Sequence, residues 1–339
     1  MNMKHTPKTS LTAVLIYVAA ILASIAVVSC RIHEYPVGPG VDPTMIVVNI
    51  DLTTDPAVAE TSTIGRSDED GCMYFIMEIY RNDFTGEPVS RLESGAVRAE
   101  DGSSSVRFID TLHAGNYKVA AFAVCTKDMQ GGSSVYDMSD LSRIVLDDTY
   151  QGSISLKECY EARFDLNISS DEWFTTMDVA ETMHSPMGRV EAVSTDAAEF
   201  LQNMTMDLPE PPGADFWEQY TVRWDYALYF PTGYNVLTGL PNKAETGITF
   251  SSAMIPVSEE EVMLGYDYVF VNGESTTVNI TLTVLDSAGE VVNTYSGLEA
   301  VIYKGETTVL RGTFLTEDRG SGIGIDPGFD GTIDIILPD

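Results

Sequence analysis

The sequence predicts an all-β protein with one short helix, folded as two antiparallel β-sandwich domains. Apolar residues alternate with polar ones in many short segments, and such alternation is typical of strands that bury one face. Turn residues separate these segments at short intervals, as at residues 286–289 and 231–233, which favours antiparallel sandwiches over parallel α/β units. Aliphatic, aromatic and cysteine residues make up 44% of the 339 residues, enough for two ordinary domain cores.

The N-terminal residues have the pattern of a secretory signal. Lys4 and Lys8 precede an apolar stretch at residues 11–28, and Ser29-Cys30 closes it. A cysteine after a small residue resembles the bacterial lipoprotein box, which implies removal of residues 1–29 and acylation of Cys30, palmitate included. The alternative is a transmembrane anchor of marginal length, but the Ser29-Cys30 end fits cleavage better. The resemblance therefore implies a lipid anchor in the cell outer membrane.

The chain is strongly acidic. Its formal net charge of −32 becomes −34 once the signal, which holds two lysines and no acid, is removed. Such a surface repels nucleic acid and anionic membranes, so both are poor partners. The spacing of Cys72, Cys125 and Cys159 fits no metal site, and buried free thiols are favoured over a disulfide.

The domains are expected to follow a lipidated tether at residues 30–44, which is rich in Pro and Gly. The boundary between the two sandwiches is expected near residues 155–162, giving an N-terminal domain at 45–158 and a C-terminal domain at 159–339. Strands are expected at residues 46–52, 72–80, 104–110, 117–125, 152–158, 164–168, 220–230, 264–271, 278–284, 291–295, 307–315 and 332–337.

One segment departs from the two-residue period and predicts a helix near residues 189–202. Its apolar residues recur at spacings of three and four, with Ser185 as a cap and Pro186 in the first turn. Gly188 is unfavourable within such a helix. The apolar stripe is expected to pack on a sheet and consists of Val190, Val193, Ala197, Phe200 and Leu201.

No pattern of catalytic or cofactor chemistry is present in the sequence. It has no Gly-x-Ser-x-Gly elbow, phosphate loop or His-Glu-x-x-His motif, so we expect no enzyme activity and no cofactor. The acidic run at residues 68–71 resembles a calcium loop only superficially, because Arg66 and Met77 occupy positions where the loop needs acids. We therefore expect no metal site.

A group of aromatic residues offers two interpretations. The even-numbered members on the predicted strand share a face with Val222, which favours a core position, whereas Tyr229 points the other way. Exposed rings would instead suit sugar stacking in a surface glycan-binding lipoprotein of a nutrient-uptake system, which is the alternative function. The group consists of Trp217, Tyr220, Trp224, Tyr226, Tyr229 and Tyr234.

A local motif is typical of β-sandwiches. In the segment LHAGNYKV at residues 112–119, Gly115 can adopt a backbone conformation closed to other residues. Tyr117 can then enter the core and return its hydroxyl to the backbone, as in a tyrosine corner. The Leu-x-x-Gly-x-Tyr pattern resembles transthyretin-like modules, which implies that the two sandwiches are transthyretin-like.

Several longer segments together resemble the fimbrillin-like lipoproteins of Bacteroidales, the subunits of type V pili. The resemblance implies a lipid-anchored fimbrial subunit acting in surface assembly or adhesion, with other fimbrial subunits as partners. It covers about a fifth of the chain. The segments are PMGRVEAVSTD (186–196) with Phe200, FPTGYNVLTGLPN (230–242), LGYDYVFVNG (264–273), VLRGTFLT (309–316) and GIGIDPGFDG (322–331).

The resemblance also implies sites for maturation and assembly. Arg66 is a candidate site for an arginine-specific protease, although it follows the first apolar strand by over a dozen residues. Residues 323–337 are the candidate donor strand for strand exchange, with Ile333, Ile335 and Leu337 alternating on one face. The same strand is also compatible with pairing inside its own domain.

Two short sequences resemble the O-glycosylation sequon of Bacteroidota, Asp followed by Ser or Thr and an apolar residue. They are Asp110-Thr111-Leu112 and Asp286-Ser287-Ala288. Ser287 is the more credible acceptor, because it lies in a predicted hairpin turn.

Overall fold

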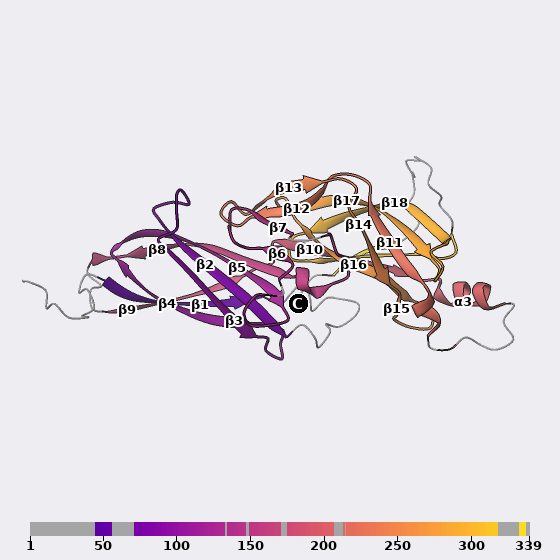
Figure 1. Ribbon diagram of the computed structural model, residues 1–339, viewed down its shortest axis with the longest axis horizontal. Coiled ribbons are helices and arrows are strands. Elements are labelled where there is room, and N and C mark those ends of the chain that lie inside the picture. Colours follow the sequence, from indigo (N-terminus) through magenta and orange to yellow (C-terminus); the bar gives the residue numbers. More distant parts are fainter. Residues whose placement is uncertain are drawn as a thin grey trace, which may run out of the picture.

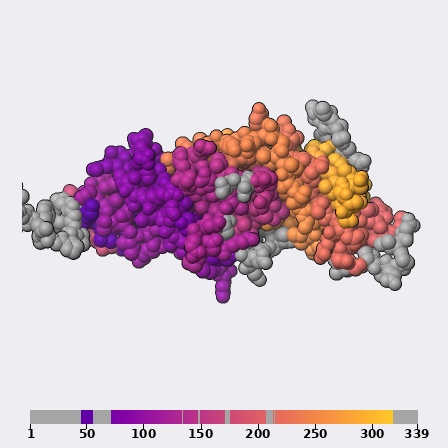
Figure 2. Space-filling model, viewed as in Figure 1, coloured from indigo at the N-terminus to yellow at the C-terminus, as the bar shows by residue number. Residues whose placement is uncertain are grey.

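The computed structural model describes residues 45–55, 71–132, 134–146, 149–170, 175–206, 213, 215–317 and the backbone of 332–336. Strands dominate it, and the fold class predicted from the sequence is confirmed. Two sandwiches lie end to end in an elongated molecule, the N-terminal one at one end and the C-terminal one at the other (Figures 1 and 2).

The first sandwich packs a three-stranded sheet against a four-stranded one. The first sheet has the order β4 (Ser105–His113), β1 (Met45–Thr54), β9 (Thr176–Met183). The second has the order β3 (Ser90–Val97), β2 (Cys72–Arg81), β5 (Gly115–Thr126), β8 (Cys159–Ile168). The alternating inward residues of both sheets form one core, as expected for a sandwich.

The second sandwich packs a five-stranded sheet against a four-stranded one. The five-stranded sheet has the order β15 (Ile255–Pro256), β16 (Val262–Phe270), β10 (Met187–Ser194), β19 (Thr307–Gly312), β20 (Thr332–Ile336). The four-stranded sheet has the order β14 (Thr249–Ala253), β11 (Thr221–Tyr226), β17 (Ser275–Leu285), β18 (Val291–Tyr303). Their inner faces share a second core.

A small sheet links the two halves of the chain. Its order is β13 (Leu240–Glu245), β12 (Phe230–Asn235), β7 (Ile144–Leu146), β6 (Tyr136–Asp137), so strands from both halves pair in it. A third apolar cluster lies at this junction and draws on the outer face of β2 and β5 as well as on β12 and β16. Its large members include Ile76, Phe122, Tyr136, Ile144, Tyr234 and Phe270.

The strand pairing differs from the expected domain division at residue 158. Strand β8 pairs antiparallel with β5, and β9 pairs parallel with β1, so both belong to the first sandwich. Lys157 and Glu158 at the expected boundary are buried, so this stretch is a packed connection and not an exposed linker. Residues 155–157 form a 3-10 helix, η1 (Ser155–Lys157), where a strand was expected.

The predicted helix is also corrected by the structure. The helix, α3, spans Ala197–Thr205, and residues expected to begin it form β10 instead. All eight residues of β10 are buried between β16 and β19, so the two-residue period is hidden. A register shift between Ala192 and Val193 also moves one apolar side chain out of alternation.

The burial predicted for the apolar stripe is nevertheless confirmed. Val190, Val193, Ala197 and Phe200 are buried, and the partly exposed Leu201 packs against the core that contains Val190, Ala197 and Phe200. Phe200 contacts the rings of Phe216 and Trp217 in the short helix η3 (Phe216–Gln219), which fixes α3 on the second sandwich.

The tyrosine corner is present, but its glycine plays a different part from the one expected. Tyr117 is buried, and its hydroxyl donates a hydrogen bond of 3.0 Å to the backbone oxygen of His113. Gly115 has no left-handed backbone conformation, and a Cβ there would meet Tyr117 at an ordinary contact distance of 3.5 Å. The corner therefore does not need glycine for its backbone geometry.

Candidate functional site

Strand β1 is the middle strand of the three-stranded sheet of the first sandwich and the centre of the candidate assembly site. It pairs antiparallel with β4 on one side and parallel with β9 on the other. Its inward side chains, Ile46, Val48, Ile50 and Leu52, are each 0% exposed. Burying such a side chain stabilises a fold by about 1.5–3 kcal/mol, so this strand contributes much to the first core.

Polar side chains fix the outer face of β1 to its neighbours. The amide of Asn49 donates to the carboxylate of Asp178 on β9 at 2.8 Å. The guanidinium of Arg107 on β4 binds Asp51 through two bonds of 2.6 Å. These bonds lower the pKa of Asp51, the hydrogen bond from Arg107 being the main cause. The alternation of apolar and polar residues thus sets the register of the sheet.

Loss of β1 would open a slot in the first sandwich. The strands β4 and β9 would each lose a hydrogen-bonding neighbour, and the apolar groove between them would face water. Such a groove accepts an extended strand whose alternate side chains are apolar, with main-chain hydrogen bonds on both sides.

The candidate anchor and the candidate cut site flank β1 in the sequence. Cys30 precedes it and Arg66 follows it, and both lie outside the residues that the structure describes. A cut after Arg66 would therefore separate β1, together with the anchor, from the rest of the chain. Both assignments stay predictions.

The candidate donor strand forms β20 at the edge of its own C-terminal sheet. It pairs antiparallel with β19, so that Ile333 lies opposite Leu310 and Ile335 opposite Thr308. Leu337 lies beyond the described residues. Among the described strands β19 is its one neighbour. The chain thus adopts the intramolecular pairing that the sequence left open beside the donor role.

The two candidate glycosylation residues occupy different surroundings. Ser287 is exposed in the turn between β17 and β18, where the carboxylate of Asp286 accepts the N–H groups of Ala288 and Glu290 at 2.9 Å. Thr111 is exposed on β4, opposite Val47 of β1. Ser287 is therefore presented on a turn and Thr111 on a paired strand, and modification of either stays a prediction.

Most of the aromatic residues considered for sugar stacking lie in the core. Tyr220, Trp224 and Tyr226 are buried, as the strand alternation predicted, and Tyr234 on β12 is buried as well. Trp217 is half-buried and stacks on Phe200, whereas Tyr229 is 76% exposed. This arrangement uses the rings for packing, which weighs against the glycan-binding alternative.

The sequence did not reveal several buried ion pairs near the junction of the sandwiches. Arg98 binds Glu158 at 2.9 Å, and Arg189 binds Glu191 at 2.7 Å. Burial tends to lower the pKa of Arg98. The carboxylate of Glu158 outweighs this effect, so the pKa of Arg98 is raised. Arg98 and Glu158 lie 60 positions apart, so no local pattern could have identified that pair, whereas Arg189 and Glu191 are two positions apart on one strand.

The described part of the chain holds no group of three or more His, Cys, Asp or Glu side chains suited to a metal ion. Among the same residues no helix has the length and apolar character needed to cross a bilayer. Cys125 and Cys159 are buried and Cys72 is partly exposed, and none of these three described cysteines forms a disulfide.

Comparisons with known proteins give one match that spans almost the whole chain. The profile of a family described as "Family of unknown function (DUF6562)" matches residues 43–338. No curated protein matches the sequence.

Solved structures similar to this chain include a candidate cell adhesion protein and a fimbrial protein. A candidate cell adhesion protein from Bacteroides eggerthii shares 15% identity with a TM-score of 0.46, covering 89% of this chain and 98% of its own. The tip fimbrial protein Mfa3 from Porphyromonas gingivalis, with a C-terminal truncation, shares 12% identity with a TM-score of 0.41, covering 87% and 99%. The resemblance to fimbrillin-like proteins is thus confirmed as a resemblance, but similarity this distant does not transfer a function.

Proposed function

The chain belongs to the DUF6562 family of unknown function, and from its own residues we propose that it is a non-enzymatic, lipid-anchored fimbrial subunit that assembles by β-strand exchange at the cell surface. Its partners are other fimbrial subunits and, through acylated Cys30, the lipid of the outer membrane. The placement of β1 is the single observation that carries the proposal.

The first step of this proposal is anchoring. Acyl chains on Cys30 hold the secreted chain at the outer membrane, because several chains exceed the threshold for stable membrane attachment. Residues 31–44 then separate the lipid from the first described strand. In this state β1 completes the first sandwich.

The second step is release of β1. A cut after Arg66 removes the anchor and β1 from the covalent chain, and the strand can then leave the slot between β4 and β9. The cost of exposing four aliphatic side chains is offset only when another strand enters. An empty slot therefore drives the recruitment of a second subunit.

The third step is donation of β20. An edge strand with one described neighbour has fewer main-chain hydrogen bonds to lose than β1, which has two neighbours. The alternation of Ile333, Ile335 and Leu337 in the sequence suits a groove shaped for Ile46, Val48, Ile50 and Leu52.

Replacement of Arg66 tests this route. The Arg66→Ala protein should remain full-length in the membrane fraction and be absent from high-molecular-weight polymers sheared from the cell surface. Arg31→Ala, a change next to the lipid, is the matched control and should assemble normally. Polymers of Arg66→Ala at the level of the unaltered protein would show that β1 is not released by this cut.

A further inference from the structure

A lysine and an aspartate meet in the interior where the connection between the sandwiches contacts the second sandwich. Lys157 ends η1, in the connection that leads into β8, and Asp267 lies on β16 of the second sandwich. Their side chains are 3% and 0% exposed. The Nζ atom of Lys157 donates a hydrogen bond directly to Oδ1 of Asp267.

Further donors surround the carboxyl group of Asp267. The hydroxyls of Tyr150 and Tyr226 donate to its Oδ2 atom at 2.5 Å and 2.8 Å. The backbone N–H of Tyr268 donates to Oδ1 at 2.9 Å. Nζ of Lys157 also lies 4.1 Å from the centre of the Tyr150 ring. The carboxyl is therefore polarised from several sides inside an aromatic enclosure.

Burial acts on the protonation of the lysine and of the two phenols. Burial lowers the pKa of Lys157, although the charge of Asp267 works in the other direction. Burial also raises the pKa values of Tyr150 and Tyr226, so both phenols keep the protons they donate. In an apolar interior, a neutral amine beside a neutral acid costs less free energy than two charged groups. A proton that moves along the hydrogen bond from nitrogen to oxygen converts the charged pair into the neutral pair.

We propose that Lys157 and Asp267 condense to an intramolecular amide that covalently ties the joint between the sandwiches to the second sandwich. The lone pair of neutral Nζ attacks Cγ of the protonated Asp267 carboxyl, and a C–N bond forms. The C–O bond to the hydroxyl breaks, and that hydroxyl takes a proton from nitrogen and leaves as water. The reaction consumes no oxidant and no co-reactant.

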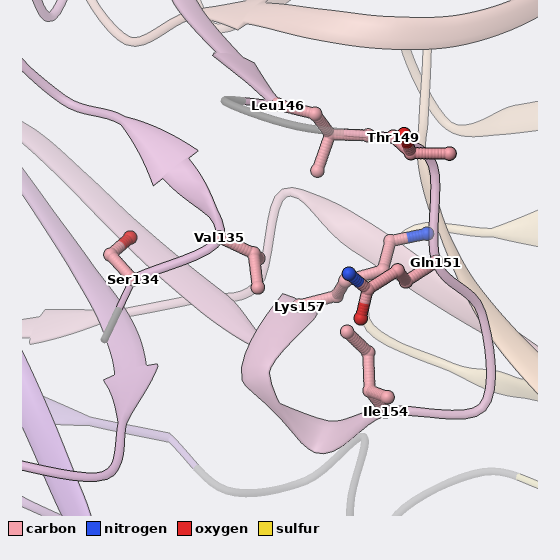
Figure 3. A pocket seen from close by; sticks show the side chains of 7 residues that line it. All are labelled: Ser134, Val135, Leu146, Thr149, Gln151, Ile154 and Lys157. Carbon is pink, nitrogen blue, oxygen red and sulfur yellow. The ribbon is translucent and has the colours of Figure 1, made fainter.

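The geometry supplies what this condensation requires. The fold holds the amine and the carboxyl in direct contact, which replaces a bimolecular encounter by an intramolecular one. The phenols donate to Oδ2 and stabilise the negative charge that develops on the carboxyl oxygen during attack. A small cavity of about 90 Å³ adjoins Lys157 and can receive the departing water (Figure 3).

Other buried pairs of the described residues lack this reactivity. Arg98 and Arg189 also meet carboxylates, but a guanidinium keeps its proton and is no nucleophile. Lys304 contacts Glu161 at 3.0 Å, but its side chain is 31% exposed and remains hydrated. Lys157 is the buried lysine among those described.

A tryptic peptide map of the native protein tests the amide. Trypsin does not cleave after a lysine whose amine is acylated, so residues 144–163 should be joined to residues 244–304 in one branched peptide. Its mass should be the sum of the two peptides less one water. Ordinary cleavage after Lys157, with both peptides free and of full mass, would overturn the proposal.

Two variants show which lysine takes part in the reaction that releases water. Lys157→Arg keeps the positive charge but cannot form the amide, so its two peptides should be separate and of full mass. Lys304→Arg, the matched control, should keep the branched peptide. A loss of water that persists in Lys157→Arg would place the reaction elsewhere and also overturn the proposal, and this readout does not depend on how well the variant folds.

Discussion

At the scale of single residues, aromatic packing fixes α3 on the second sandwich. Phe200 is 2% exposed, and its ring lies 5.3 Å from that of Tyr220 and 6.1 Å from that of Trp217. No charged side chain caps α3, because the carboxylate of Asp196 binds the backbone of Thr316 instead of the helix. The helix therefore depends on this ring for its position.

Phe200→Ala should destabilise the protein by about 3–5 kcal/mol, because truncating a buried aromatic residue loses transfer energy and leaves a cavity. Denaturant unfolding measures the change. Met206→Ala is the control, since Met206 is 72% exposed at the end of the same helix and its loss should cost little. A shift below about 1 kcal/mol for Phe200→Ala would mean that the ring is not part of the core.

Tyr117→Phe should destabilise the first sandwich by about 0.5–1.5 kcal/mol, the usual net contribution of one hydrogen bond. The substitution removes only the hydroxyl that binds the backbone oxygen of His113. Tyr229→Phe removes an exposed hydroxyl and should leave stability unchanged. Equal stabilities for Tyr117→Phe and the unaltered protein would contradict a stabilising corner.

Residue-level patterns predicted contacts that are local in sequence and missed the distant ones. The Tyr117 corner joins residues four positions apart, so its motif is visible in the sequence. The contact between Lys157 and Asp267 joins residues 110 positions apart, and neither residue stands in a distinctive local pattern. Such pairs become visible only when the sheets are assembled.

At the scale of secondary structure, β10 passes very close to a neighbouring strand. A Cβ on Gly188 would lie 2.2 Å from the backbone oxygen of Tyr303 on β18 and 2.5 Å from a methyl of Ile302. Gly188, unfavourable in the predicted helix, is thus required by the packing of a strand.

Gly188→Ala should destabilise the second sandwich by about 1–3 kcal/mol, the usual cost of overpacking, because backbone must move to admit the methyl group. Thermal or denaturant unfolding measures the loss. Gly71→Ala is the control, since a Cβ at Gly71 meets nothing within 4 Å. Unchanged stability of Gly188→Ala would show that β10 and β18 lie further apart than described.

Regular alternation made β1 predictable from the sequence, whereas β10 and the very short strands were not. In β1 the burial alternates with every residue, and the expected segment is correct. In β10 every residue is buried, so the period vanishes and the segment is mistaken for part of a helix. The strands β6 and β15 have two residues each, too few to show any period.

At the scale of the whole molecule, the candidate anchor, β1 and the candidate cut site follow one another along the chain, an order that would connect membrane attachment with assembly. The fold class can be predicted from the alternation of apolar residues and from the turn residues, but the division of the chain into two sandwiches cannot. The first sandwich closes only when β9, far along the chain, pairs in parallel with β1. A parallel pairing between such distant strands has no local signal.

Cys30→Ala should release the protein from the detergent phase, because the candidate residue for acylation is lost. Partitioning in a phase-separating detergent, followed by immunoblotting, measures the effect. Cys72→Ala should partition like the unaltered protein. Unchanged detergent partitioning of Cys30→Ala would remove the basis of the lipid anchor.

Deletion of residues 323–339 tests the central claim of strand exchange most directly. The measurement is the fraction of the protein in high-molecular-weight polymers after shearing from the cell surface, with circular dichroism of the purified chain as the folding control. The account predicts a folded, secreted monomer that no longer enters polymers, because β20 is an edge strand and its donor role is lost. Asp334→Asn should still assemble. A truncated chain that unfolds or aggregates would mean that β20 belongs to its own core, and undiminished polymers would contradict donation by β20.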